Sequence, residues 1–291
     1  MTPLSIYHPS QLDSNNPPAL ERFRWRFLAE GDSWFTIGTL NPAKNSNLLF
    51  ELAFDSSACA VNCASPGDTL GHMAQMNADP VFVGLLAGRT ARPWDALLLS
   101  AGGNDLIDAV QTPTTAGSDP ARRLLLRADE WGDPALGPAR YLSDAGWTTF
   151  CTYIQANLDH LVTLRDSGKS KGVPIFMHGY AIPTPRPSGI GAGIGPWIHP
   201  AVTAAGIPEA DCAAIGRLLM GRLAALLGGC AADAARYPNL HFFDSTTLPV
   251  VPAEPGTTGE SGDWINEIHL TWRGYEKVAL SWSAAIAAVM R

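Results

Sequence analysis

Hydrophobic positions along the chain fall into five short apolar runs, separated by longer segments with helical spacing. The runs have the length of buried strands and cover residues 23–29, 58–62, 96–101, 174–178 and 240–244. Apolar residues recur at about every 3.6 positions most clearly over residues 147–165, 208–236 and 271–290. This alternation predicts βαβ crossovers and an α/β fold with a central, mostly parallel five-stranded sheet.

Two stretches interrupt the alternation, and we interpret them as inserted loops of a single domain spanning residues 1–291. Residues 111–144 carry repeated Pro, Gly and Asp, and residues 180–206 are dense in Gly and Pro. The alternating glycines between 189 and 195 would suit a phosphate cradle only between a strand and a helix N-terminus, and neither is convincing here. We therefore expect a flexible lid or a pocket wall over residues 180–206.

Composition and charge exclude some classes of partner. The chain is 46% hydrophobic and 16% charged, with a formal net charge of -7. Nucleic-acid binders need clustered Lys and Arg, so we expect no nucleic-acid partner. Residues 213–232 are the most membrane-like stretch, but Arg217 and Arg222 interrupt them, and we expect a packed helix without integral membrane contact. The N-terminal sequence lacks the basic and apolar regions of a secretory signal, so we expect a cytoplasmic protein.

Distinctive polar motifs follow four of the five predicted strands. Ligands gather outside the carboxyl ends of parallel strands, which makes these positions the candidates for a functional site. The motifs are Gly31-Asp32-Ser33 after the first strand, NCASPGDT (62–69) after the second, Gly102-Gly103-Asn104-Asp105 after the third, and DWINEIHLT (263–271) after the fifth.

In order and spacing, these blocks resemble the SGNH, or GDSL-type, serine hydrolases, and the resemblance extends from residue 31 to residue 275. It implies a three-layer α/β/α, flavodoxin-like fold and hydrolysis of carboxylic esters through a covalent acyl-enzyme. It implies Ser33 as the nucleophile and His269 as the general base. The oxyanion would be held by the backbone N–H groups of Ser33 and Gly67 and by the side-chain amide of Asn104. We assign Asp32 a structural role in the turn.

The residue types suit this chemistry on their own account. A serine hydroxyl needs a base to take its proton as it attacks an ester, and imidazole titrates in the right range. Fixed N–H donors then stabilise the charge that develops on the carbonyl oxygen. Each motif taken alone also suits a helix cap or a turn. The sequence GDSWF lacks the G-x-S-x-G elbow, which disfavours the separate α/β-hydrolase fold.

One position departs from the family pattern. The usual triad aspartate, three residues before the histidine, is replaced by Asn266. A carboxylate both orients the imidazole and stabilises the imidazolium, whereas an amide oxygen does mainly the first. The alternatives are Asp263 or Glu267, a backbone carbonyl, or Asn266 itself. We favour a Ser-His dyad helped by Asn266 or a backbone carbonyl, with Asp263 as the acid if there is one, and interpret Glu267 as a solvated loop charge.

Aromatic residues and histidines near the motifs supply candidates for substrate binding. The candidate substrate-binding residues are Trp34, Phe35, His178, Tyr180 and Trp272. Thr271 is predicted to cap the last helix. The other histidines have no metal-ligand spacing and the five cysteines form no C-x-x-C pair, so we expect neither a metal nor a cofactor.

The sequence thus predicts a serine esterase that acts on a small-molecule ester, such as a short acyl ester, a lipid ester or an acetylated sugar. Two alternatives stay open. If residues 180–206 close over the site and exclude water, the same residues would support acyl transfer to another alcohol. Because the usual triad acid is absent, the chain would alternatively be a catalytically weak relative that binds an ester or a glycan.

Overall fold

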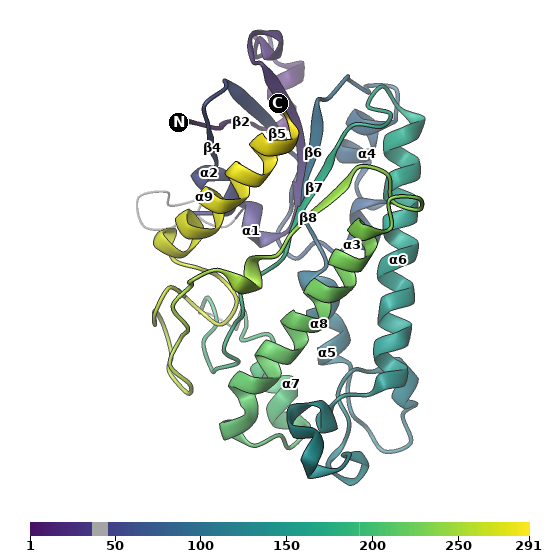
Figure 1. Ribbon diagram of the computed structural model, residues 1–291, viewed down its shortest axis with the longest axis vertical. Coiled ribbons are helices and arrows are strands. Elements are labelled where there is room, and N and C mark those ends of the chain that lie inside the picture. Colours follow the sequence, from purple (N-terminus) through teal and green to yellow (C-terminus); the bar gives the residue numbers. More distant parts are fainter. Residues whose placement is uncertain (37–45, 192) are drawn as a thin grey trace.

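The computed structural model describes residues 1–36, 46–191 and 193–291, and in this part of the chain a parallel sheet lies between two helical layers (Figure 1). The sheet has six strands in the order β2-β5-β3-β6-β7-β8, and all neighbouring pairs are parallel. Its strands are β2 (Ser5–Tyr7), β3 (Trp25–Gly31), β5 (Ala58–Asn62), β6 (Ala96–Ser100), β7 (Ile175–His178) and β8 (Leu240–Phe243). Two short strands, β1 (Thr2–Pro3) and β4 (Ala53–Phe54), pair with each other antiparallel.

The predicted α/β class with a mostly parallel sheet is confirmed, but the predicted number of five strands is wrong. All five predicted strands are present, and β2 is an additional edge strand paired with β5. The sequence pattern missed β2 because it is three residues long and each of them is only partly buried. A strand this short carries too few positions for the alternation of apolar and polar side chains to show.

The helices of the described residues cover both faces of the sheet. They are α1 (Ser33–Thr36), α2 (Leu48–Glu51), α3 (Leu70–Met73), α4 (Pro80–Leu86), α5 (Gly103–Gln111), α6 (Asp144–Ser167), α7 (His199–Ala204), α8 (Cys212–Ala232) and α9 (Trp272–Val289). His178 of β7 packs against Trp282 of α9, whereas Phe242 of β8 approaches Gly228 of α8. Phe242 is in register with Met177, the neighbour of His178, so α8 and α9 lie on opposite faces of the sheet.

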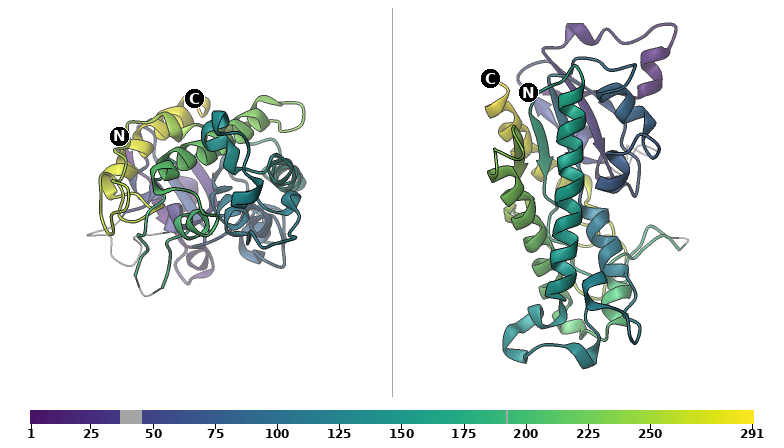
Figure 2. Two further views of the ribbon diagram at one scale, coloured as in Figure 1. Left: turned by 90° about the horizontal axis from the view of Figure 1, so that it is seen from below. Right: turned by 90° about the vertical axis from the view of Figure 1, so that its right-hand side faces the viewer.

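The three helices predicted from apolar spacing correspond to α6, α8 and α9, and polar caps fix where they begin. The Ser143 hydroxyl accepts the Gly146 N–H at 3.0 Å and starts α6, which runs along the long axis of the molecule (Figure 2). The Thr271 hydroxyl accepts the Gly274 N–H at 3.3 Å, so Thr271 caps α9 as predicted. This cap fixes the loop that carries His269.

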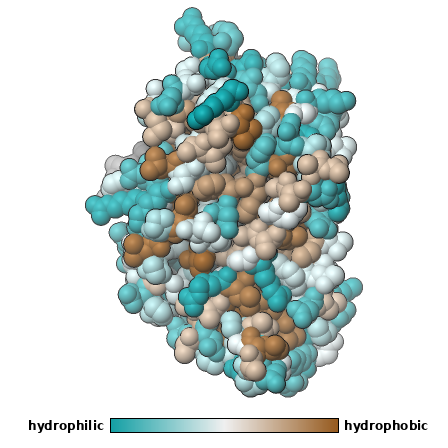
Figure 3. Space-filling model, viewed as in Figure 1, coloured by the Kyte–Doolittle hydropathy of each residue, from teal (hydrophilic) through white to brown (hydrophobic). Residues whose placement is uncertain are grey.

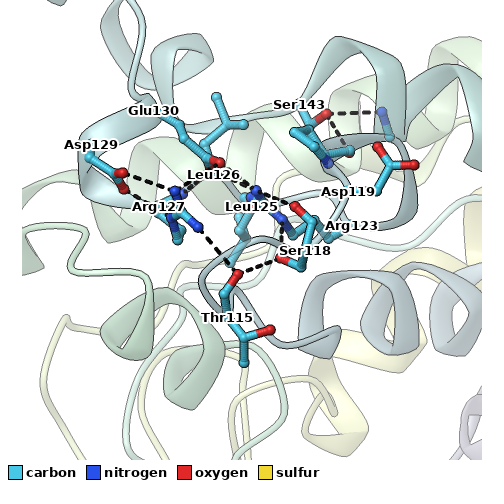
Figure 4. Close-up of polar contacts among 12 residues, drawn as sticks. Thr115, Ser118, Asp119, Arg123, Leu125, Leu126, Arg127, Asp129, Glu130 and Ser143 are labelled. Atoms are coloured by element: carbon cyan, nitrogen blue, oxygen red, sulfur yellow. Dashed lines mark hydrogen bonds and ion pairs between the residues drawn. The ribbon is translucent and has the colours of Figure 1, made fainter.

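The insertion at 111–144 is folded rather than irregular. It contains the 3-10 turns η3 (Pro120–Arg122), η4 (Ala128–Glu130) and η5 (Pro134–Tyr141). The buried guanidinium of Arg123 ties these turns together, because it donates to Glu130 at 2.7 Å, to the Leu125 carbonyl at 2.7 Å and to the Ser118 hydroxyl at 3.0 Å (Figure 4). The second insertion, 180–206, contains α7, and Ala192 within it lies outside the described residues.

Among the described residues, one helix is long and apolar enough to cross a membrane by length and composition alone. It spans Glu209–Ala232, and 44% of its most apolar window is buried. One face of α8, with Leu219, Leu223 and Leu227, is buried in the core. Hydrophobic residues on the face of the molecule that carries α8 are scattered among hydrophilic ones (Figure 3). These features are typical of a core helix of the kind predicted from the sequence.

Candidate active site

Ser33 lies at the point where β3 ends and α1 begins. The turn requires glycine at position 31, because the Gly31 backbone passes close to β6. A Cβ at this position would lie 2.7 Å from the Ser100 Cβ. A larger residue at position 31 would push the two strands apart. Ser33 is the first residue of α1, so its backbone N–H has no carbonyl partner one turn earlier in the helix.

His269 lies next to Ser33 in the fold, although the two residues are 236 positions apart in the sequence. The Ser33 Oγ and the His269 Nε2 lie 2.7 Å apart, which is hydrogen-bond distance. His269 is 1% exposed, and the edge of the Trp197 ring packs against it at a centroid distance of 5.2 Å. The two residues assigned by resemblance as nucleophile and base are therefore in direct contact.

Asn266 fixes which nitrogen of His269 carries the proton. Its Oδ1 accepts the backbone N–H groups of Ile268 at 3.0 Å and His269 at 2.9 Å, and these donors can face only an oxygen. The same Oδ1 lies 3.0 Å from the His269 Nδ1. Nδ1 must therefore carry the proton, which leaves Nε2 unprotonated and able to accept the Ser33 hydroxyl proton. Of the alternatives for the missing acid, the structure places Asn266 at this nitrogen.

His269 is held in its neutral form. Burial lowers the pKa of His269 to about 3, since an imidazolium would lose its hydration there. An imidazole with a lowered pKa stays unprotonated at neutral pH, as a general base requires. Asn266 contributes no charge that would oppose this effect.

We predict that Asn266→Asp shifts the pH dependence of catalysis. A carboxylate at the same place would accept the same three N–H groups and would raise the pKa of His269, because it favours the imidazolium. Protonated His269 cannot act as a base, so the acid limb of kcat/KM should move to higher pH by about 1 to 3 pH units. We also expect kcat at pH 7 to rise by roughly tenfold or more, because the imidazolium formed during attack is stabilised. The measurement is a pH–rate profile with a chromogenic ester.

Asp263 provides the matched control for Asn266, because its carboxylate binds other partners than His269. Its Oδ2 accepts the Val251 N–H and the Lys277 ammonium, both at 2.6 Å, and it is not the partner of the His269 ring. The expectation of Asp263 as the acid is therefore not supported by its position. Asp263→Asn should leave the pH profile unchanged and lower the free energy of unfolding by about 1 to 3 kcal/mol, since it breaks a largely buried charge-assisted bond. A profile that shifts with Asp263→Asn but not with Asn266→Asp would contradict the assignment.

Glu267 was expected to be a solvated loop charge, and this is wrong. Glu267 is 0% exposed. Its carboxylate accepts the backbone N–H groups of Trp197, Ile198 at 2.9 Å and His199 at 2.7 Å, at the start of α7, and that of Arg186 at 3.2 Å. Burial raises the pKa of Glu267, and these backbone bonds act in the opposite direction. Glu267 thereby anchors the insertion at 180–206 to the loop that carries His269.

Asn104 lines the cavity beside Ser33, at the start of α5. Its Nδ2 donates one bond to the Asp68 carbonyl at 3.0 Å, and an amide NH₂ has a second hydrogen to offer. Gly67 lies one residue before that carbonyl, on the exposed turn, and is not among the residues that line this cavity. Lack of space does not explain glycine at position 67, since a Cβ there would meet nothing within 4 Å. Glycine is favoured instead by its φ of 87°.

Asp32 has the structural role in the turn that the sequence suggested. Its carboxylate accepts the Trp34 N–H at 2.9 Å, the Ser100 hydroxyl at 2.8 Å and the Tyr180 hydroxyl at 2.5 Å. Burial raises the pKa of Asp32 to about 6, against the effect of these three bonds. Asp32 therefore connects the nucleophile turn to β6 and to the start of the 180–206 insertion.

Two of the five candidate substrate-binding residues, Trp34 and Tyr180, line the cavity. The other three do not, so their assignment is corrected. Phe35 and His178 pack in the core against Trp282, where burial lowers the pKa of His178 to about 4. Trp272 is 47% exposed on the outer side of α9.

The remaining lining residues were not predicted from the sequence. The cavity has a volume of about 30 Å³, and its apolar lining also includes Ile107, Ala181, Pro183, Ile198, Met220, Trp264 and Ile268. Three of these residues belong to the insertion at 180–206, which we interpreted from the sequence as a lid or a pocket wall. That interpretation was the only sequence feature that pointed to them. The buried indole N–H of Trp264 has no hydrogen-bond partner within the described ranges.

No family model matches the chain, and no curated protein matches it in sequence. Several solved structures resemble it. A lipase from Streptomyces rimosus is 17% identical, with a TM-score of 0.47 over 90% of this chain and 99% of the lipase. A phospholipase A1 from Streptomyces albidoflavus is 16% identical, with a TM-score of 0.47 over 90% of this chain and 98% of that chain. A carbohydrate acetylesterase from Sinorhizobium meliloti is 13% identical, with a TM-score of 0.47 over 91% of this chain and 100% of that chain. At such distances, function must be inferred from the site itself.

Proposed function

We propose that the protein is a serine hydrolase of the SGNH type that hydrolyses carboxylic esters through a covalent acyl-enzyme. The observation that carries the proposal is the 2.7 Å contact between the Ser33 Oγ and the His269 Nε2, with Nδ1 protonated toward Asn266. A pure binding site has no physical need for a hydroxyl that is hydrogen-bonded to the unprotonated nitrogen of a buried imidazole. The contact therefore favours catalysis over the binding alternative.

The reaction follows from the positions of these groups. His269 Nε2 takes the hydroxyl proton as the Ser33 Oγ forms a bond to the ester carbonyl carbon. The Asn104 amide and the Ser33 backbone N–H stabilise the negative oxygen of the tetrahedral intermediate. The C–O bond to the alcohol then breaks, and the protonated His269 gives its proton to the leaving oxygen. In the second half, His269 deprotonates a water that attacks the acyl-enzyme, and the acid leaves with Ser33 regenerated.

The cavity points to an ester with a small apolar acyl group. Trp34, Ile107, Met220 and Ile268 contribute to its apolar wall, and its volume of about 30 Å³ leaves room only for a small group. Among the described residues no lysine or arginine lines it, so none of them would form an ion pair with an anionic headgroup there. Acetate or butyrate esters are therefore the first substrates to assay.

Acyl transfer to an alcohol other than water is the second candidate. It is favoured by Ala181, Pro183 and Ile198, which line part of the cavity wall, because an acyl-enzyme in a more enclosed site is better protected from water. Product analysis in the presence of added alcohols separates the two reactions, since transfer yields a new ester and hydrolysis yields the free acid.

Covalent labelling tests the proposal directly. An alkyl p-nitrophenyl phosphonate should react with Ser33 to form a stable adduct at one mole per mole of protein, with release of p-nitrophenol. Mass spectrometry of the digested protein should place the adduct on the peptide that contains Ser33. Ser65→Ala, which removes an exposed serine at the end of the neighbouring strand, should label like the wild type. Equal labelling of Ser33→Ala would refute the assignment of the nucleophile.

A further inference from the structure

Three carboxylates converge beside the turns that build the active site. Glu30 belongs to β3 and lies three residues before Ser33, Asp68 follows Gly67, and Asp79 caps the N-terminus of α4. One carboxylate oxygen from each of the three acids lies within 4.8 Å of the other two. Like charges this close repel strongly, so something must compensate them.

Two of the oxygens in this cluster are buried without a partner. Glu30 is 0% exposed; its Oε1 accepts the Gly31 N–H at 2.7 Å, while its Oε2 has no hydrogen-bond partner. Asp79 Oδ1 accepts the Phe82 N–H at 2.9 Å, and its Oδ2 is likewise buried without a partner. Buried polar atoms are ordinarily satisfied, so these two need an explanation.

Cationic side chains do not explain these unpartnered oxygens. In the described part of the chain, neither Glu30 nor Asp79 forms an ion pair with Lys, Arg or His. Asp68 pairs only with His72, at 3.5 Å, and the His72 side chain is 65% exposed. Burial raises the pKa of Glu30 well above its usual range, and the charge of Asp79 adds to this effect. Burial also raises the pKa of Asp68.

A proton and a metal ion satisfy this geometry differently. Ionised carboxylates only accept hydrogen bonds, so a proton shared by Glu30 and Asp79 would satisfy those two and leave Asp68 with only His72 as a partner among the described residues. A divalent cation would contact all three at once. Carboxylate oxygens bind Ca²⁺ at roughly 2.3–2.6 Å, so two ligands of one ion lie at most about 5 Å apart. The 4.8 Å limit found here fits this requirement.

We propose that Glu30, Asp68 and Asp79 bind a divalent cation of the oxygen-preferring class, with Ca²⁺ as the best fit. The Cys63 thiol nearby does not redirect the site toward a thiophilic metal. Its sulfur is not among the ligand atoms that lie within 4.8 Å of one another. A hard cation with all-oxygen ligands suits this donor set.

The site is accessible from solvent. A surface groove lined by Asp68 and Asp79, together with Ser65 and Asp13, reaches the cluster and would admit the ion with part of its hydration shell. No sequence motif indicates this site, because its ligands are 38 and 11 positions apart, on a strand, in a turn and at a helix cap.

The bound ion would connect the two halves of the proposed active site. It would join β3, just before the nucleophile, to the turn whose Asp68 carbonyl accepts the Asn104 amide. The cation would thus fix the distance between the turn that carries Ser33 and the turn that carries Asp68. Binding itself does not depend on the proposed ester hydrolysis.

Thermal unfolding with calcium chloride as the probe tests the site. The full chain is first treated with a chelator and then scanned with calcium or with sodium chloride of equal ionic strength. We expect calcium well above its dissociation constant to raise Tm by about 5 °C in the wild type. Asp79→Asn keeps the helix cap, because asparagine caps as well as aspartate, and should lose this shift. Glu30→Gln should lose it too, while its amide satisfies Asp79.

Asp13→Asn is the matched control, since Asp13 lines the same groove outside the cluster. It should keep the full calcium response, and calorimetric titration should give one bound ion for it and for the wild type. Absence of a response in the wild type would overturn the proposal in favour of a shared proton. An equal response in Asp79→Asn would overturn it as well, because the ion would then bind elsewhere. Neither result bears on Ser33, which the phosphonate labelling tests separately.

Discussion

Ser33→Ala should lower kcat/KM for a p-nitrophenyl acetate or butyrate ester by at least about 10⁴-fold. The substitution removes the only atom that forms the covalent bond and leaves the imidazole without the proton it accepts. The oxyanion donors and the apolar cavity are untouched, so a small residual rate above the uncatalysed reaction should persist. The measurement is initial-rate kinetics at pH 7 with the wild type assayed in parallel.

The fold should survive this change. The side chain of Ser33 contacts His269 at 2.7 Å and forms no other hydrogen bond within the described part of the chain, and alanine suits the first turn of α1. Circular dichroism and Tm should match those of the wild type. Ser65→Ala should keep full activity. If Ser33→Ala retained more than a tenth of the wild-type rate, the acyl-enzyme mechanism would be abandoned.

Asn104→Ala should lower kcat by about 100- to 1000-fold while changing KM less than threefold. The carbonyl oxygen gains negative charge only as the tetrahedral intermediate forms, so the bond from the Asn104 amide is strongest at the transition state. Substrate binding in the ground state depends mainly on the apolar wall and is little affected. Saturation kinetics with the butyrate ester separate kcat from KM.

Asn62→Ala controls for the loss of a partly buried amide near the site. Asn62 ends β5, and its Nδ2 donates to the Phe35 carbonyl at 3.1 Å, much as the Asn104 Nδ2 donates to the Asp68 carbonyl. It does not line the cavity. Both variants should be destabilised to a similar extent, but only Asn104→Ala should lose kcat. A rise in KM alone for Asn104→Ala would show that Asn104 binds the substrate without stabilising the oxyanion.

The sequence predicted the strands and the motifs that follow them because both are local features. The buried strands are short, mainly apolar runs, and parallel strands place their carboxyl ends at one edge of the sheet. Ser33, Asn104 and His269 lie in these motifs, and the resemblance of the motifs to SGNH hydrolases implied their roles. Ser33 and His269 lie in contact, and Asn104 lines the cavity beside Ser33. Thr271 as the cap of α9 is also confirmed.

The contacts that depend on the direction of a side chain could be determined only from the tertiary structure. Asp263, Asn266 and Glu267 lie within five positions of one another, and the sequence could not rank them as partners of His269. Their side chains leave the loop in different directions: Asp263 toward Lys277, Asn266 toward His269, and Glu267 toward the start of α7.

The same reason explains the other corrections and the proposed cation site. Strand alternation turns His178 into the aromatic core, although its position at the end of β7 suggested the pocket. Glu30 and Asp79 meet because β3 and α4 are neighbours in space, not in sequence. Periodicity along a chain determines which positions are buried in a strand or helix. Contacts between segments depend on how the layers pack, and that packing is a property of the whole fold.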